Sequence, residues 1–165
     1  MDTLWIVSVF LMLAAAAFLV MIVSVWNSVS QPSRVQFLGN INMALDKARK
    51  ERKPVLIDVH SDDSVWCVRM NREVYSRSDV VTMLSEDFVP LQLNPERSRR
   101  SRAFCRQLGF KKYPFVMVID SRGNEVTRIT DYVPADEFVD TVVEARERAA
   151  VMESVPAMAP PPPKQ

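Results

Sequence analysis

Apolar residues recur along the chain in short runs, some with the spacing of helices and some with the spacing of strands. Helical spacing, with apolar residues three and four positions apart, predicts helices over 40–50, 64–75, 79–84, 96–108 and 134–152. Buried-type or alternating runs predict strands over 54–60, 88–93, 115–119 and 125–130. A strand–helix–strand crossover makes its two strands parallel, and a hairpin makes the last two antiparallel. The pattern therefore predicts an α/β fold, a mixed sheet with helices on both faces.

Residues that cap or interrupt these elements mark the boundaries of the folded region. Asn40 or Asn42 is suited to cap the first helix, because its side chain can accept from unpaired backbone N–H groups. Pro90 lies inside the second strand and lacks a backbone N–H, which favours a position at the sheet edge or an irregular start of the strand. We expect a folded domain over 40–152 and a proline-rich tail over 153–165 that is disordered or polyproline II.

Residues 4–26 contain no charged side chain and are mostly apolar. At about 1.5 Å per residue, a helix of this length spans roughly 34 Å, enough for a bilayer core of about 30 Å. Trp5 and Trp26 stand near its two ends, where indole prefers the headgroup region. A cleaved signal peptide is the alternative, but no Lys or Arg precedes the segment and its apolar core is long. We expect a retained transmembrane helix over 4–26, in contact with membrane lipid, followed by a linker over 27–39.

Charged residues outside this anchor nearly balance, with 21 Lys and Arg against 19 Asp and Glu once Asp2 is set aside from the total of 20. A near-neutral domain gives no reason to expect nucleic-acid binding. The basic residues flanking the apolar segment favour a cytoplasmic domain only slightly, so the side of the cell membrane stays open. One stretch is strongly basic: a solvated helix face is the simpler interpretation there, and docking to anionic lipid is the alternative. Its members are Arg97, Arg99, Arg100, Arg102, Arg106, Lys111 and Lys112.

Cys67 follows Trp66 where the first strand passes through a short polar loop into a helix. Unpaired backbone N–H groups and the positive end of the helix dipole both favour thiolate, the form that attacks disulfides. The position three residues later, where a second cysteine would resolve a mixed disulfide, holds Met70. The pattern therefore indicates a single reactive thiol, with an inert, half-buried cysteine as the alternative.

Three other residues could take part in chemistry at Cys67, but each has a simpler interpretation. Met70 is expected to fill the core, and Cys105 is expected to pack in the core from within its helix. His60 is interpreted as a loop histidine, ahead of a general base for Cys67 or a metal ligand with Asp62. Two cysteines so far apart do not indicate a disulfide framework.

From about 40 to 146 the chain resembles thioredoxin-like domains. The run Lys53-Pro54-Val55-Leu56-Ile57-Asp58, followed by Trp66-Cys67, is similar to the lysine–proline–strand–tryptophan–cysteine run of that superfamily. Trp66 to Tyr75 resembles the corresponding run of the spermatogenesis-associated thioredoxin-like family, a subgroup with Met in place of the second cysteine. Gly123-Asn124-Glu125, Asp131-Tyr132 and Phe138 are similar to the C-terminal domain of membrane thiol-disulfide interchange reductases.

The resemblance implies a thioredoxin fold and roles for five residues. Cys67 would be the catalytic nucleophile, and Asp58 would be the buried acid that helps proton transfer. Trp66 would pack beside Cys67 at the substrate-binding surface. Tyr113-Pro114 would be the cis-proline site, whose backbone pairs with a bound client peptide. No cofactor or metal ion is implied.

Two functions of different classes remain open. In the first, Cys67 forms mixed disulfides with client thiols or disulfides, as a monothiol oxidoreductase or an isomerase-like enzyme. A lone cysteine cannot release such a client by itself, so release needs an external reductant thiol. In the second, the same surface serves a redox-inactive binding or assembly module. The missing second cysteine argues against autonomous disulfide reduction but leaves both functions standing.

Overall fold

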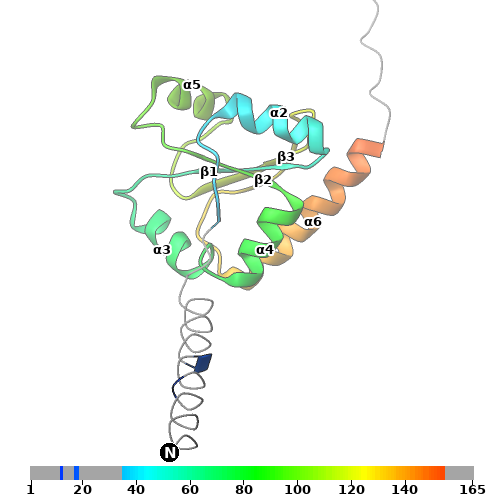
Figure 1. Cartoon of the computed structure of the whole chain (residues 1–165). Coiled ribbons are helices and arrows are strands. Elements are labelled where there is room, and N and C mark those ends of the chain that lie inside the picture. Colours follow the sequence, from blue (N-terminus) through cyan, green and yellow to red (C-terminus); the bar gives the residue numbers. More distant parts are fainter. Residues whose placement is uncertain (1–11, 13–16, 19–34, 155–165) are drawn as a thin grey trace, which may run out of the picture. The chain divides into compact units, whose positions relative to one another are not determined.

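The computed structural model describes Met12, Ala17, Phe18 and residues 35–154, and Figure 1 shows the arrangement of the elements. The chain divides into two units, residues 1–33 and 34–165, and the elements below belong to the second. They are α2 (Ile41–Glu51), β1 (Val55–Val59), α3 (Val65–Glu73), α4 (Ser78–Asp87), β2 (Val89–Leu93), α5 (Arg99–Gln107), β3 (Phe115–Ile119), β4 (Glu125–Ile129) and α6 (Ala135–Ser154). Each helix and strand predicted between 40 and 152 is present.

The four strands form one sheet in the order β2-β1-β3-β4. β1 pairs in parallel with β2, and β3 runs antiparallel to both β1 and β4, which confirms the predicted mixed sheet. β2 lies at an edge, as Pro90 requires. The Val89 N–H donates inward to the Pro54 carbonyl, whereas the Pro90 carbonyl accepts from Leu38 on the outer side. The position without an N–H therefore faces away from β1.

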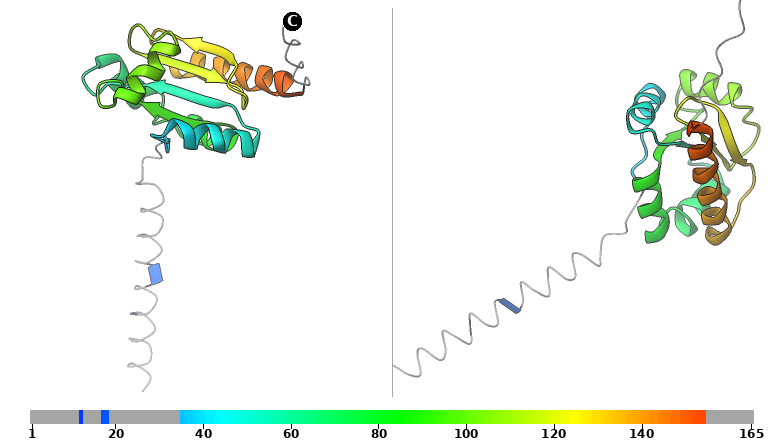
Figure 2. Two further views of the ribbon diagram at one scale, coloured as in Figure 1. Left: turned by 90° about the horizontal axis from the view of Figure 1, so that it is seen from above. Right: turned by 90° about the vertical axis from the view of Figure 1, so that its right-hand side faces the viewer.

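Helices cover both faces of this sheet, and Figures 1 and 2 show the two layers from three directions. α2 and α5 pack on one face, over a core that includes Val55, Ile57 and Val59. α3, α4 and α6 pack on the other face, over a core that includes Leu56. Because side chains alternate along a strand, Asp58 points to the same face as Leu56, the face that carries α3. This alternation places an acidic group beneath the helix that begins beside Cys67.

The folded domain extends beyond both predicted boundaries. Val35 is buried, and Leu38 forms a parallel bridge to Leu91 at the β2 edge, so residues 35–39 pack on the domain instead of belonging to the linker. At the other end α6 continues to Ser154, and its Glu153 carboxylate accepts from the Ser121 hydroxyl at 2.8 Å. These contacts come from distant parts of the chain, which local spacing does not reveal.

α5 begins three residues later than its periodicity predicts. The Asn94 side chain accepts from the backbone N–H groups of Glu96 and Arg97, which forms a turn before the helix. Ser98 then caps the helix by accepting from the Ser101 N–H at 3.3 Å. Glu96 is thereby left outside the helix, in a loop that reaches the candidate site.

Of the predicted anchor over 4–26, the structure describes only Met12, Ala17 and Phe18, which are helical and exposed. Within the described residues, no helix combines the length and the apolar character needed to cross a bilayer. The rest of the anchor, the linker as far as 34 and the tail from 155 lie outside the described residues and stay predictions.

Candidate functional site

Cys67 lies in the first turn of α3, where the sequence places it. Ser64 caps this helix, and its hydroxyl accepts from the Cys67 N–H at 3.4 Å. The side chain points inward: the residue is 2% exposed, and its Sγ lies 4.0 Å from the carbonyl oxygen of Val59. The thiol therefore sits between the end of β1 and the start of α3.

His60 borders this thiol from the end of β1. Its backbone N–H donates to the Leu93 carbonyl, and its ring Nε2 lies 3.5 Å from the carboxylate of the exposed Asp62. Its interaction with the Cys67 side chain raises the pKa of His60 against the opposing effect of burial, and nearby Asp58 adds to the rise. The charged form of His60 is thus favoured beside the thiol. The structure therefore places His60 beside Cys67, as the alternative of a base for this thiol requires.

Asp58 is 2% exposed and accepts a hydrogen bond from the Gln92 side-chain amide at 2.8 Å. Burial raises the pKa of its carboxyl group, and the bond from Gln92 only partly offsets this. The carboxyl group interacts with His60 and Tyr75, and each of these interacts with Cys67. The link between Asp58 and the thiol is therefore indirect and passes through these two side chains.

Tyr75 completes the buried side of the site. It is 3% exposed, and among the described residues its hydroxyl is the one buried side-chain oxygen or nitrogen without a hydrogen-bond partner. Burial raises the pKa of this hydroxyl well above its usual value, and Asp58 adds to the effect. Asp58 and Tyr75 thus share a low-dielectric space in which the neutral form of each is favoured.

The peptide bond between Tyr113 and Pro114 is cis, which confirms what the resemblance to thioredoxin-like domains implies. The Tyr113 hydroxyl donates to Glu96 at 3.1 Å, and the Ser61 hydroxyl donates to the other oxygen of the same carboxylate at 2.9 Å. Burial and this carboxylate raise the pKa of Tyr113, and Cys67 contributes to the rise. Glu96 therefore holds the cis-proline loop beside the loop that precedes Cys67.

Trp66 points outward from the first turn of α3 and is 47% exposed. Its ring lies against Tyr132, with centroids 5.8 Å apart, and the guanidinium of Arg69 covers the Tyr132 ring at 4.1 Å. Val65 and Val68 are also exposed, at 77% and 51%. The buried thiol is therefore flanked by an exposed apolar surface, the kind of surface that marks a contact with another molecule.

The Trp66 surface is held to the loop after β4 by a charged residue. Tyr132 donates to Glu73 at 2.6 Å, and Arg69 donates to the same oxygen at 2.8 Å. The bond from Tyr132, together with those from Arg72 and Arg69, lowers the pKa of Glu73 to about 2. Glu73 stays ionised at ordinary pH, so the stack remains assembled.

Cys105 and Met70 occupy opposite faces of the sheet. Cys105 is buried among the side chains of α2, α5 and the facing strands, and burial raises its pKa to about 11. Met70 is 1% exposed and packs in the other core, beneath α3. Both residues therefore pack in the core as predicted, and α5 does not bring a second thiol to α3. Among the residues that the structure describes, no cluster of His, Cys, Asp and Glu is arranged to hold a metal ion.

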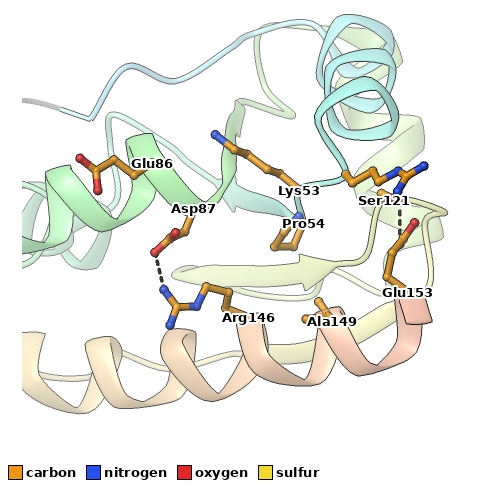
Figure 3. Close-up of a pocket in the computed structure, with 10 residues that line it drawn as sticks. Lys53, Pro54, Glu86, Asp87, Ser121, Arg146, Ala149 and Glu153 are labelled. Atoms are coloured by element: carbon orange, nitrogen blue, oxygen red, sulfur yellow. Dashed lines mark hydrogen bonds and ion pairs between the residues drawn. The ribbon is translucent and has the colours of Figure 1, made fainter. Parts of the chain in front are cut away.

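A cavity of about 170 Å³ lies at the other end of β1, next to Lys53 and Pro54 (Figure 3). Several of its charged side chains are already paired. Arg146 donates to Asp87 at 2.6 Å, Glu153 accepts from Ser121, and Lys53 lies 3.5 Å from Glu51. The cavity is thus separated from Cys67 by the length of the strand and offers no comparable reactive group.

Sequence reasoning therefore located Asp58, Trp66, Cys67, Tyr113 and Pro114 but missed their partners. The structure adds Ser61, Tyr75, Gln92, Glu96 and Tyr132. Tyr132 had one available signal, the similarity of Asp131-Tyr132 to the membrane reductase domain. The others carry no local motif, because each acts through a contact made only in the folded sheet.

Comparisons with known proteins agree on the fold. A family model described as a thioredoxin-like domain matches residues 41–146. Human spermatogenesis-associated protein 20 is 40% identical over 53 residues, which cover 32% of this chain and 7% of that protein. The chain thus aligns with only a small fraction of this curated relative, although the resemblance seen in the sequence is confirmed.

Solved structures extend the likeness to the whole sheet. A putative disulphide-isomerase from Bacteroides thetaiotaomicron superposes with a TM-score of 0.63 at 24% identity, covering 72% of this chain and 98% of that one. The DsbD C-terminal domain of Neisseria meningitidis, in its oxidised form, gives a TM-score of 0.57 at 23% identity, covering 67% and 99%. At this identity the likeness shows the fold alone.

Proposed function

The chain belongs to the thioredoxin-like domain family, and we propose that it is a membrane-anchored monothiol protein whose Cys67 forms mixed disulfides with client proteins. The observation that carries this is the position of Cys67: it lies in the first turn of a capped helix, between His60 and the loop that contains cis-Pro114. The anchor is the uncharged segment over 4–26.

The exchange begins with loss of the thiol proton to His60, which leaves a thiolate at the helix start. The thiolate attacks one sulfur of a client disulfide, forming a disulfide between Cys67 and the client while the second client sulfur leaves as a thiolate. That leaving sulfur takes the proton held by His60. The step consumes one disulfide and forms another, so no net oxidation occurs.

Release of the client needs a second thiol from outside the domain. Met70 replaces the residue that would attack from within α3, and Cys105 packs on the other face of the sheet. A small-molecule or protein thiol attacks one sulfur of the mixed disulfide and forms a new disulfide with it. The other sulfur leaves as a thiolate, so either the client or Cys67 is freed. Tyr113-Pro114 and the exposed Trp66 surface would orient the client chain during both steps.

One observation favours the second candidate, a redox-inactive binding module. Cys67 is 2% exposed, so attack on a client requires local movement of the first turn of α3. A module of this kind would use the same exposed surface of Val65, Trp66 and Val68 without sulfur chemistry. The two candidates therefore differ in whether Cys67 ever forms a covalent adduct.

Oxidised glutathione is a suitable test disulfide, because its adduct is read directly by mass spectrometry. We expect the full chain and its Cys105→Ser variant to gain one glutathione on Cys67 at neutral pH. Cys67→Ser should gain none, a loss of at least about a hundredfold in adduct rate. An adduct that forms equally in Cys67→Ser, or no adduct in the wild type, would leave the binding module as the function.

A further inference from the structure

The most uneven charge distribution of the domain lies on α5 and the loop after it. From residue 97 to residue 119 the chain carries seven cationic side chains and no acidic one, although the whole chain has a formal net charge of only +1. All seven are exposed: Arg97, Arg99, Arg100, Arg102, Arg106, Lys111 and Lys112. We call this set the basic surface.

The helix geometry directs the basic surface outward. Ser101 and Cys105 are buried on the inner side of α5, so Arg99, Ala103 and Arg106, at the spacing of one helix face, lie on the outer side. The side chains of Arg99, Arg106 and Lys111 make no hydrogen bond or ion pair with any described residue. Their charges are therefore available to a partner.

The other four cations have partners that hold them in place. Arg100 donates to Asn42 on α2 at 2.7 Å, and Arg102 donates to the Pro95 carbonyl at 3.0 Å. Arg97 and Lys112 pair with the exposed carboxylates of Asp62 and Asp131. Arg100 and Arg102 bind uncharged oxygen atoms, which do not neutralise them. Most of the positive charge of the basic surface therefore has no acidic partner.

The opposite face of the sheet has the opposite character. α6 carries six acidic residues against Arg146 and Arg148, and it packs on the face away from α5. Two helical layers of unlike charge give the near-neutral domain a preferred orientation next to a charged surface. The acidic residues are Asp136, Glu137, Asp140, Glu144, Glu147 and Glu153.

We propose that the basic surface docks the domain onto the anionic phospholipid headgroups of the membrane that holds it; this rests on the anchoring proposed above. Guanidinium groups bind phosphate oxygens in a planar, two-pronged geometry, and five of the seven cations are arginine. Each basic residue near an anionic leaflet strengthens binding by about fivefold. The three unpaired cations together would strengthen binding by on the order of a hundredfold.

A nucleic acid fits this surface less well. Single strands bind by stacking bases on exposed aromatic rings. Here the nearby aromatic residues are used internally: Phe110 packs against Tyr113 at 4.9 Å and against Phe115 at 5.8 Å. Docking through α5 also leaves α3 on the other side of the sheet. The Trp66 surface therefore stays accessible to clients while the basic surface is occupied.

The test uses the full chain in lipid nanodiscs, with a fluorophore on α5 and a quencher on the lipid headgroups. In a Cys67→Ser/Cys105→Ser background, Ala103→Cys places the label on the outer face of α5, and Ala150→Cys places it on α6 as the matched control. We expect quenching at position 103 to be about twofold stronger in anionic than in neutral discs and to disappear at high salt. Quenching at position 150 should not change.

Charge reversal identifies the residues responsible. Arg99→Glu/Arg106→Glu should abolish the difference between anionic and neutral discs. Arg72→Glu/Arg148→Glu, which changes the charge equally but on α3 and α6, should retain it. Equal quenching in both lipids, or equal loss in the two double variants, would overturn the proposal and point to an acidic protein partner instead.

Failure of this proposal is separable from failure of the proposed function. A chain that does not co-elute with neutral discs lacks the anchor, yet association with anionic discs alone would still show docking through the basic surface. Glutathione addition to Cys67 can be measured in Arg99→Glu/Arg106→Glu with both cysteines present. We expect that rate to be unchanged, because neither arginine contacts the thiol site.

Discussion

Cys67 and Cys105 are both buried and both unpaired, yet their surroundings differ in every other respect. Cys67 lies in the first turn of a capped helix and borders His60, with Tyr75 and Tyr113 nearby. Cys105 lies in the last turns of α5 among apolar side chains, and burial raises its pKa to about 11. We therefore expect the position in the helix and the polar neighbours to make the two thiols differ in reactivity.

The sharpest test of this contrast is the rate at which iodoacetamide alkylates each thiol in the folded chain. At pH 7, four pH units below a pKa of about 11, roughly one Cys105 in ten thousand is a thiolate. We expect Cys67 to react about a hundredfold faster, measured by peptide mass spectrometry. In unfolded protein the two rates should converge. Equal rates in the folded chain would break the comparison.

A second test gives each cysteine a neighbour three residues later, on the same helix turn. Met70→Cys should attack the mixed disulfide on Cys67 and release the client, raising insulin reduction with dithiothreitol at least tenfold. The change shrinks a buried side chain, so we also expect a loss of about 1–3 kcal/mol in unfolding free energy.

Leu108→Cys is the matched control for this test, because it creates the same spacing after Cys105. It should give no gain in insulin reduction. A folded Met70→Cys protein with wild-type activity would instead show that the start of α3 does not support sulfur exchange.

The smallest expected effect concerns the buried carboxyl group behind Cys67. Burial raises the pKa of Asp58, so the folded state holds this proton to higher pH than the unfolded chain does. The stabilisation is full below the unfolded pKa and is lost as pH rises through the folded pKa. Asp58→Asn, which cannot ionise, should therefore exceed the wild type by about 1–3 kcal/mol at pH 8 and by little at pH 4. Urea unfolding across this range measures the difference.

Asp120→Asn is the control, because we expect it to change the free energy of unfolding in the opposite direction. Asp120 is also buried, but its carboxylate accepts from the backbone N–H groups of Arg122 and Asn124 and from the Asn124 amide. An amide in its place loses an acceptor, so this variant should lose about 1 kcal/mol in unfolding free energy. If Asp58→Asn behaves in the same way, burial is not the dominant influence on Asp58.

Prediction from sequence succeeded where a feature depends on neighbouring residues and failed where it depends on distant ones. The strand over 115–119 was predicted to the residue, because a continuous apolar run needs burial on both faces. The start of α5 was placed three residues early, because the Asn94 turn competes with a helix that periodicity alone would extend. The contact between His60 and Cys67 was uncertain for the same reason, since only the packed loop shows which group the ring faces.

The sequence by itself determined the order of the elements, the edge position of Pro90 and the position of Cys67 at a helix start, because spacing, proline chemistry and capping act within a few residues. Only the tertiary structure decided that Glu96 joins Ser61, 35 residues away, to Tyr113, 17 residues away. It likewise decided that Cys105 packs on the face away from α3. Such contacts depend on which strands pair and which face each helix covers, and the free energy that selects them comes from burial of the whole sheet.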